Sequence, residues 1–250
     1  IVVHLAARVH QMAEDATDPL YAYRQVNVEG TRNLAESAAR AGVKRFVYLS
    51  SVKVNGEENA KAYTETHEPS PTDAYGISKM KGESALKTIC EKSGMEFVII
   101  RPPLVYGPEV KANFLALMRL VDCRIPLPLA SVTNRRSFIY LGNLIDCIYN
   151  CMTHPAAAGQ TYLVSDDKDV STPGLIRLIA TSLKKPVCLF PFPQAFLSII
   201  GRLLGKENAI KRLLGSLTVD ISKIKRELNW TPPFTIESGL LDTADWYKTK

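Results

Sequence analysis

The sequence lacks the features that mark several common protein classes. Its five cysteines are odd in number and include no CxxC pair, which argues against a disulfide framework and against a zinc site. Cys147 and Cys151, four residues apart, are interpreted as thiols on the buried face of a helix, and we expect no bound metal. Free thiols favour a reducing, cytoplasmic location.

Long apolar runs and dense basic stripes are also missing. The longest apolar stretches are too short to cross a bilayer, which needs about 20 residues, so no transmembrane segment is expected. Nucleic-acid binders usually carry a basic stripe over a whole module, and we therefore expect no nucleic-acid partner.

What the chain does contain is an ordinary globular composition with a small positive surplus. Of its 250 residues, 46% are hydrophobic and 22% are charged, which argues against disorder and allows a large core. Residues 181–250 hold 11 basic and 6 acidic side chains and so carry most of the surplus. Such a basic end hints at a phosphate-bearing ligand or an anionic surface.

Strand and helix patterns alternate along the chain, which predicts a parallel α/β sheet. The apolar start is typical of a buried parallel strand. A capping Asp18 followed by Pro19 predicts a helix that runs to Arg40 and stops at Gly42. The other predicted strands are 43–50, 95–101 and 161–164, and the other predicted helices are 73–93, 113–121, 143–152, from 172, 195–204, 208–214, 222–228 and 236–247.

These elements predict two parts. Residues 1–108 are expected to form a Rossmann-like, doubly wound parallel sheet, to which later segments such as 137–165 return. Residues 109–250 are expected to form mainly a smaller C-terminal lobe that binds the substrate. Ligands of open α/β sheets bind at the carboxyl ends of the strands, so we expect the lobe to cover that edge.

One spacing points to proton-transfer chemistry. Tyr75 and Lys79 lie four residues apart, which places both side chains on one face of a helix. An ammonium beside a phenol favours the phenolate and is expected to lower a phenol pKa that starts near 10. Such a phenol can accept a proton from a sugar or alcohol hydroxyl. Ser50 and Ser51 follow a predicted strand, where a serine hydroxyl can hydrogen-bond the same oxygen.

Seven segments in the same order resemble the extended short-chain dehydrogenase/reductases, in particular their nucleotide-sugar epimerase/dehydratase group with its UDP-glucose 4-epimerase-like members. They are VHLAA at 3–7, NVEGT at 27–31, SSVKVNG at 50–56, YGISK at 75–79, RPPLVYGP at 101–108, RSFIY at 136–140 and the ending at 220–230. The resemblance implies hydride chemistry at C4 of a sugar on a nucleoside diphosphate. It implies NAD as the cofactor and leaves NADP open.

The resemblance also assigns roles. It makes Tyr75 the catalytic base, Ser51 its hydrogen-bonding partner and Lys79 both a catalytic residue and a ligand of the nicotinamide ribose. The implied cofactor-binding positions are Leu5, Ala6, Ala7, Asn27, Ser50, Tyr75, Lys79 and Pro102. The implied substrate-binding positions are Lys53, Leu104, Asn113, Phe114, Arg136, Arg212 and Leu217. Asn113, the Phe114 amide and the two arginines match diphosphate and uridine contacts, for which a guanidinium fork is suited.

Departures from the family pattern narrow the expected reaction. Val52 and Lys53 stand where the 4,6-dehydratases have an Asp–Glu pair, which disfavours a dehydratase. Leu104 replaces a common Asn near the substrate. Leu217, or Ser216 if the match slips, is smaller than the Tyr of glucose-restricted members and would leave room for an acetamido group. We therefore expect a UDP-hexose or UDP-N-acetylhexosamine 4-epimerase that acts through a 4-keto intermediate.

Two alternatives stay open at this stage. A nucleotide-sugar 4-ketoreductase would use the same Tyr75, Ser51 and Lys79 but release oxidised cofactor. A membrane-surface or lipid-linked-sugar binder would use the basic, apolar run at 184–214.

The family's glycine-rich βαβ unit, which cradles the dinucleotide pyrophosphate on backbone amides, has no counterpart because no GxxGxxG occurs. We expect an N-terminally truncated sheet, an exposed strand at Val2–Leu5 and poor dinucleotide binding by these 250 residues alone. The resemblance further implies a homodimer through a four-helix bundle built from 19–40 and 73–93.

Overall fold

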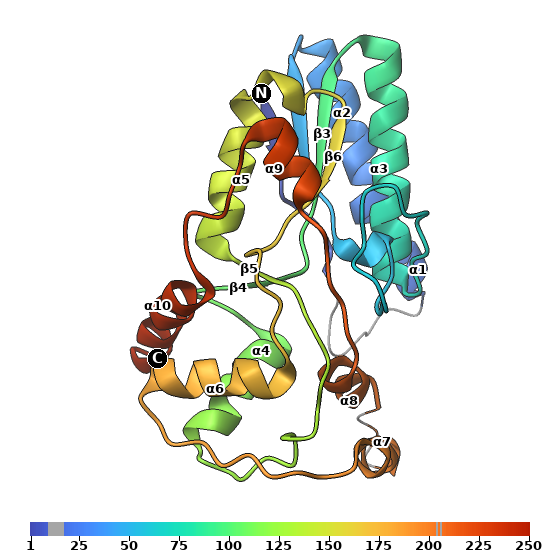
Figure 1. Cartoon of the computed structure of the whole chain (residues 1–250). Helices are drawn as coiled ribbons and strands as arrows, with labels where there is room; N and C mark the ends of the chain where they lie inside the picture. The colour runs from blue at the N-terminus through green and yellow to red at the C-terminus, as the bar shows by residue number, and fades with distance from the viewer. Residues whose placement is uncertain (10–17, 204, 206) are drawn as a thin grey trace.

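A four-stranded parallel sheet forms the centre of the upper part of the molecule (Figure 1). The computed structural model describes residues 1–9, 18–203, 205 and 207–250. The strands, in spatial order, are β1 (Val2–His4), β2 (Arg45–Leu49), β3 (Glu96–Arg101) and β6 (Gln160–Leu163). Both faces of β2 and β3 are buried, as expected for parallel strands covered by helices on both sides.

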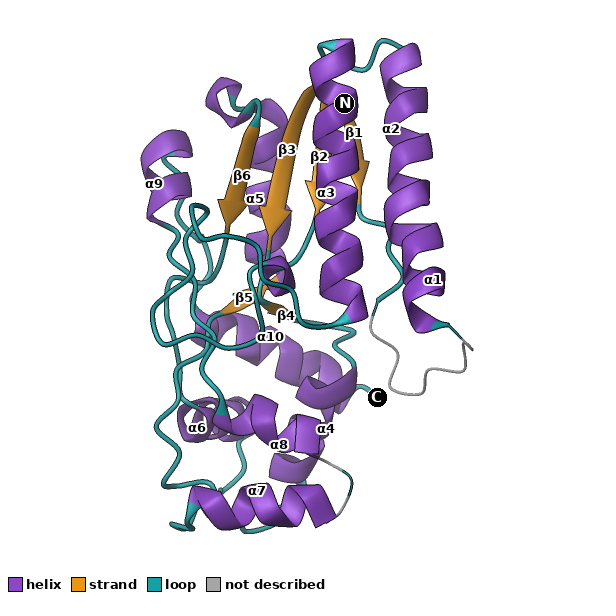
Figure 2. Ribbon diagram, turned by 90° about the vertical axis from the view of Figure 1, so that its right-hand side faces the viewer, coloured by secondary structure: helices purple, strands orange, loops and turns teal. Residues whose placement is uncertain are grey.

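Helices cover both faces of this sheet. One face carries α1 (Pro19–Arg24), α2 (Gly30–Arg40) and α3 (Ala74–Ser93), and Figure 2 shows α2 and α3 side by side. The other face carries α5 (Leu141–Thr153) and α9 (Ser222–Leu228). The buried Cys147 and Cys151 of α5 pack with Trp230 against the sheet. The predicted α/β class with a doubly wound parallel sheet is confirmed.

The helix ends follow the capping signals. Asp18 accepts a hydrogen bond from the amide of Tyr21 at 3.0 Å, and Asp73 accepts one from the amide of Gly76 at 2.6 Å. Gly94 ends α3 in a left-handed conformation, with φ of 72°. The helix predicted to be continuous over 19–40 is instead interrupted by a π-helical segment, η1 (Gln25–Glu29), an irregularity that often marks functional sites.

A second, mainly helical lobe lies at the end of the sheet to which the strand arrowheads point (Figures 1 and 2). Its helices are α4 (Ala112–Asp122), α6 (Thr172–Leu183), α7 (Gln194–Leu203), α8 (Glu207–Leu214) and α10 (Ile236–Lys248). They share a hydrophobic core of their own that includes Phe114, Met118, Ile176 and Leu240. Leu204 and Lys206, which belong to the basic, apolar run at 184–214, lie outside the described residues. The predicted domain boundary at residue 108 stays a prediction.

A small parallel pair that the sequence patterns did not predict lies between the two parts. It consists of β4 (Leu104–Tyr106) and β5 (Phe138–Tyr140). The buried Asp166 fastens it, because its carboxylate accepts hydrogen bonds from the Tyr106 hydroxyl at 2.8 Å, the Tyr140 amide at 2.8 Å and the Asn143 side chain at 2.7 Å. The chain also forms two short 3-10 turns, η2 (Val52–Val54) and η3 (Pro155–Ala157).

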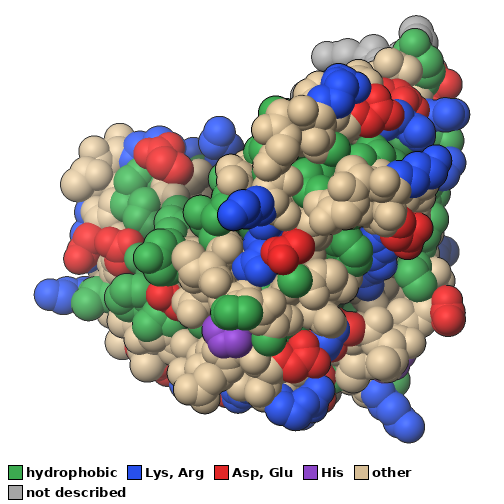
Figure 3. All heavy atoms as spheres, turned by 90° about the horizontal axis from the view of Figure 1, so that it is seen from above, with side chains coloured by type: hydrophobic (Ala, Val, Ile, Leu, Met, Phe, Trp, Pro, Cys, Tyr) green, Lys and Arg blue, Asp and Glu red, His purple; other side chains and the backbone are tan. Residues whose placement is uncertain are grey.

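The surface seen from the top of Figure 1 carries Lys and Arg interspersed with Asp and Glu (Figure 3). Within the described residues, none of the helices combines the length and the apolar composition that spanning a bilayer requires. The described part of the chain also holds no cluster of three or more His, Cys, Asp or Glu placed to bind a metal ion.

Candidate active site

Ser51 and Tyr75 come together where two segments meet below the sheet. Ser51 follows β2 and begins η2, and Tyr75 lies in the first turn of α3. The Ser51 hydroxyl lies within hydrogen-bonding reach of the Tyr75 phenol and acts to lower its pKa. The ring of Tyr23 on α1 packs edge-on against Tyr75, with ring centroids 6.2 Å apart. The predicted pairing of a strand-end serine with the helix tyrosine is therefore present.

The electrostatics of Tyr75 differ from the expectation. Burial raises the pKa of Tyr75 to about 12, and the negative charge of Asp73 adds to this, while the Ser51 hydroxyl opposes it. The expected lowering by Lys79 is wrong for the protein without a ligand. Burial also lowers the pKa of Lys79 to about 7, so this side chain is a weak source of positive charge near neutral pH.

Lys79 is a buried residue whose amine lies against an aromatic ring. Its exposed fraction is 1%, and its Nζ lies over the ring of Tyr48, 4.1 Å from the centroid. Because an aromatic face attracts a cation, Tyr48 holds this amine one helical turn along α3 from Tyr75.

Asn27, implied as a cofactor ligand, uses its side chain within the protein. Its Oδ1 accepts a hydrogen bond from the Arg8 amide at 2.8 Å, and its Nδ2 donates to the Arg8 carbonyl at 3.0 Å and to Ser78 Oγ at 2.9 Å. It thereby holds the segment after β1 against α3. The preceding residues of that segment, Leu5 and Ala6, are exposed. The implied cofactor role of Leu5 and Ala6 stays a prediction.

A buried ion pair beneath the site was not predicted. Arg101 donates two hydrogen bonds to the Glu83 carboxylate, at 2.9 and 2.6 Å, and Ser50 Oγ donates to the same carboxylate at 2.5 Å. Arg101 also donates to Asn55 Oδ1 at 3.1 Å, which connects β3 to the loop after η2. The sequence does contain a pattern that points to Glu83. It follows Lys79 by four residues and therefore lies on the same face of α3 as Tyr75 and Lys79.

Most predicted site residues line one cavity of about 560 Å³ between the sheet and the lobe. Ser51 and Tyr75 lie in its wall. All seven predicted substrate positions line it too: Lys53, Leu104, Asn113, Phe114, Arg136, Arg212 and Leu217. Lys79, Ser50, Asn27, Pro102 and Leu5 to Ala7 are not part of that wall. The cavity therefore joins the proton-transfer pair to the arginines, although they are far apart in the sequence.

The arginine side of the cavity is built to hold negative charge. Arg136 is half-buried, and its Nη1 donates to the carbonyls of Arg212 at 2.8 Å and Gly215 at 3.0 Å. Burial, with the charge of Arg212, lowers the pKa of Arg136, although Glu58 opposes this. The N-terminus of α4 lies in the same wall, and such helix ends attract phosphate groups. Glu109, just before this helix, and Ala112, its first residue, are held in left-handed conformations, a strain found often at functional sites.

Comparisons with known proteins fit this geometry. The model of the NAD dependent epimerase/dehydratase family matches residues 1–165. Over 247 residues the chain is 47% identical to the UDP-glucose 4-epimerase of Vibrio cholerae, covering 98% of this chain and 75% of that protein. It is 28% identical over 246 residues to the N-acetyl-alpha-D-glucosaminyl-diphospho-ditrans,octacis-undecaprenol 4-epimerase of Escherichia coli O157:H7, covering 93% and 74%. Among solved structures, the UDP-glucuronic acid 4-epimerase of Bacillus cereus with NAD superimposes with a TM-score of 0.78 at 22% identity, covering 99% and 74%.

Proposed function

The chain belongs to the NAD dependent epimerase/dehydratase family, and from this premise we propose that it is a nucleotide-sugar 4-epimerase acting on UDP-hexoses or UDP-N-acetylhexosamines. The observation that carries the proposal is the single cavity in which Ser51 and Tyr75 face the arginine side. A nucleotide sugar needs both at the same time: proton-transfer groups beside the reacting sugar and positive charge around its diphosphate. The 47% identity to a UDP-glucose 4-epimerase supports the same reaction.

In this proposal, Tyr75 takes the proton of the sugar 4-hydroxyl as it is oxidised and returns it when the ketone is reduced. The Ser51 hydroxyl shares the hydrogen bond to that oxygen. Bound NAD supplies the hydride acceptor and, once reduced, the hydride donor. Lys79 fits the role of a ribose ligand, because it lies one helical turn from Tyr75 and its amine is held at the face of the Tyr48 ring.

Inversion at C4 requires that the 4-keto sugar turn over while the nucleotide stays bound. Arg136, Arg212 and the N-terminus of α4 would hold the diphosphate through charge-assisted hydrogen bonds. The sugar side is lined by Leu104 and Leu217, which offer apolar contact rather than fixed hydrogen bonds. Firm phosphate contacts with loose sugar contacts suit an epimerase.

The residues after Ser51 argue against a dehydratase. Val52 is buried, and the Lys53 ammonium is paired with Glu57 and Asp73. Neither position offers the carboxyl pair that would carry protons during loss of the C6 hydroxyl.

Turnover of the full-length protein with NAD and either UDP-glucose or UDP-N-acetylglucosamine tests the proposal. We expect the C4 epimer of the acetamido substrate to form. Turnover of UDP-glucose alone would restrict the substrate to hexoses. Net consumption of NADH with a 4-keto sugar nucleotide, and no epimer from either substrate, would favour the ketoreductase instead.

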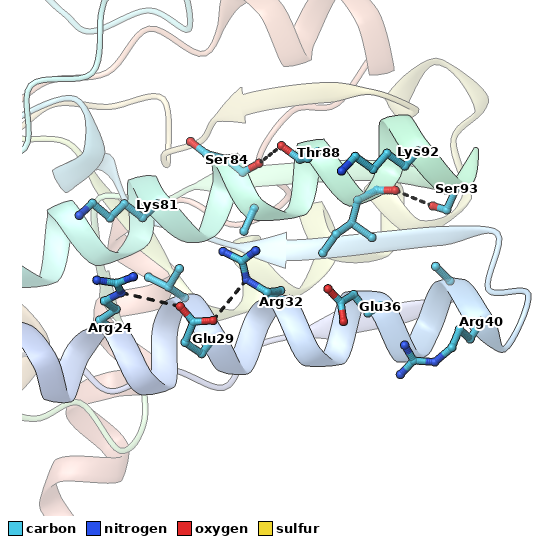
Figure 4. Close-up of a pocket in the computed structure, with 14 residues that line it drawn as sticks. Arg24, Glu29, Arg32, Glu36, Arg40, Lys81, Ser84, Thr88, Lys92 and Ser93 are labelled. Atoms are coloured by element: carbon cyan, nitrogen blue, oxygen red, sulfur yellow. Dashed lines mark hydrogen bonds and ion pairs between the residues drawn. The ribbon is translucent and has the colours of Figure 1, made fainter.

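We further propose a homodimer that packs through α2 and α3. A groove of about 690 Å³ lies along these helices, and its lining includes the apolar Val28 and Ile89. Figure 4 shows charged side chains such as Arg32 and Glu36 along it. Glu29 lies between Arg24 and Arg32, with nitrogen–oxygen distances of 3.7 and 3.3 Å. A two-fold axis would let each groove receive the other copy's helices.

Light scattering during gel filtration measures this assembly. We expect the mass of two chains for the natural protein and of one chain for Ala85→Glu, which places a charge in the groove wall. A single-chain mass for the natural protein would contradict the dimer.

A cytoplasmic location, with a role in nucleotide-sugar supply for polysaccharide biosynthesis, is also proposed. All five cysteines are free thiols, and Cys123 and Cys188 are exposed, which suits a reducing compartment. Cell fractionation measures this, and recovery from an oxidising compartment would contradict it.

One observation favours a second candidate function, docking on an anionic membrane to reach a lipid-linked sugar. Phe196, Ile199 and Leu203 share one face of α7 and are 58%, 55% and 80% exposed. Arg202 and Lys211 lie close by, and apolar helix faces with basic flanks bind bilayer interfaces. The E. coli relative named for an undecaprenol-linked substrate supports this candidate. Co-sedimentation with phosphatidylglycerol vesicles is expected at low salt and should be lost in Leu203→Ser; no binding at low salt would contradict it.

A further inference from the structure

The two segments that carry Ser51 and Tyr75 are in unusually close contact. Gly76, next to Tyr75, lies so near η2 that a Cβ atom there would come within 2.7 Å of the Lys53 carbonyl oxygen. The Lys53 amide donates to Ser51 Oγ at 3.2 Å. The backbone of Lys53 therefore touches both the serine side and the tyrosine side of the site.

The side chain of Lys53 joins the same two segments. Its ammonium forms an ion pair with Asp73, the residue that caps α3, and a second one with Glu57 at 2.7 Å. The side chains of Lys53 and Asp73 are only 23% and 27% exposed, so water screens the pair less than it would screen a surface pair. Burial pushes the pKa of Asp73 upward, but hydrogen bonds from Lys53 and the Gly76 amide outweigh burial and the pKa is lowered overall.

Asp73 acts on Tyr75 as well as on the helix end. Its negative charge raises the pKa of the phenol, and Lys53 is the cation paired with that carboxylate. Among the described residues, Tyr23 of α1 and Ser51 also act on the Tyr75 phenol, Tyr48 of β2 interacts with it, and Lys79 lies one turn along α3. The ion pair of Lys53 with Asp73 therefore involves the carboxylate whose charge, after burial, most raises the pKa of Tyr75.

We propose that Lys53 is a positioning residue whose ion pair with Asp73 both locks η2 to the start of α3 and offsets the carboxylate charge beside Tyr75. This inference rests on the proposed function, because it takes Tyr75 as the base. Glu57 also accepts a hydrogen bond from the ammonium, at 2.7 Å, and its side chain lies within hydrogen-bonding reach of Asp73.

Two substitutions that each break the ion pair of Lys53 and Asp73 distinguish an electrostatic effect on Tyr75 from a purely structural role. Asp73→Asn keeps an oxygen for the cap and removes the negative charge, so the rise of kcat with pH should move to lower pH. Lys53→Met leaves the carboxylate uncompensated, so the rise should move to higher pH. Each shift should be about 0.5 to 1 pH unit, because the altered charge is half-buried and lies near the Tyr75 phenol. Lys53→Arg should restore the natural profile.

The control is the exposed pair of Lys168 and Glu237, whose side chains are 54% and 50% exposed. Lys168→Met should leave the profile unchanged. If both test variants lose activity without shifting the profile, or shift it in the same direction, the proposal is wrong. If Asp73→Asn does not fold, Asp73→Ser keeps a capping oxygen and removes the charge in the same way.

A direct readout keeps this test separate from the proposed function. NMR of the protein labelled at tyrosine Cζ, with Tyr75 assigned from Tyr75→Phe, follows the phenol without any turnover. Opposite displacements of its titration in the two variants support the proposal even if no substrate turns over. Equal titrations in the two variants overturn it even if the natural protein is an active epimerase.

Discussion

Replacing Lys79 by Met should stabilise the ligand-free protein near neutral pH. The Lys79 residue is 1% exposed, and burial lowers the pKa of its amine from 10.5 to about 7. The unfolded chain therefore binds one more proton than the folded one between pH 7 and 10.5, so folding stability rises with pH across this window. Below pH 7 the whole cost applies, and at about 1.36 kcal/mol per pKa unit it reaches about 5 kcal/mol. Met fills the same space without a charge.

Urea unfolding of both proteins from pH 6 to pH 9 measures this effect. The Met variant should be more stable than the natural protein at pH 6. Its advantage should shrink by about 3 kcal/mol by pH 9, because the folded lysine is neutral above pH 7 while the unfolded lysine is still protonated and gains less from its proton as the pH approaches 10.5. Taking the difference between the two proteins cancels every other titrating group. Lys81, an exposed lysine on the same helix, provides the control, because Lys81→Met should change nothing with pH. A stability difference that stays constant from pH 6 to pH 9 would refute the assigned pKa.

Three further predictions concern activity and packing. Tyr75→Phe should lower kcat of epimerisation by about a hundredfold to ten thousandfold while leaving KM for the UDP-sugar close to natural, as steady-state kinetics will show. Arg136→Lys should instead raise that KM about tenfold with little change in kcat, because one ammonium cannot hold the carbonyls of Arg212 and Gly215 and also grip phosphate oxygens. Gly82→Ala should destabilise the fold by about 1–3 kcal/mol in urea unfolding, since its Cβ would come within 2.6 Å of the Asn27 carbonyl oxygen.

The features of the fold and the site that could be predicted from the sequence depend on residues that are close together in the chain. Tyr75 and Lys79 share a face because of helix periodicity, and α3 begins at Asp73 and ends at Gly94 because of capping. The alternation of buried strands and helices similarly predicted the sheet and the position of the lobe at its carboxyl ends.

The parts that were missed depend on residues far apart in the chain. Glu83 and Arg101 pair across 18 residues, and Lys53 and Asp73 across 20, so neither pair has a periodic signature. The pKa of Tyr75 was assigned the wrong direction because the ammonium was assumed to be charged, whereas burial, which spacing does not reveal, disfavours its charged form.

Inversion at C4 through a 4-keto sugar can be followed with substrate that carries deuterium at C4. The full-length protein is incubated with NAD and UDP-N-acetylglucosamine labelled in this way, and the product is analysed by NMR. We expect the C4 epimer with its deuterium retained and no lasting accumulation of NADH. An epimer that has lost its deuterium, or a 4-keto product formed together with stoichiometric NADH, would contradict it.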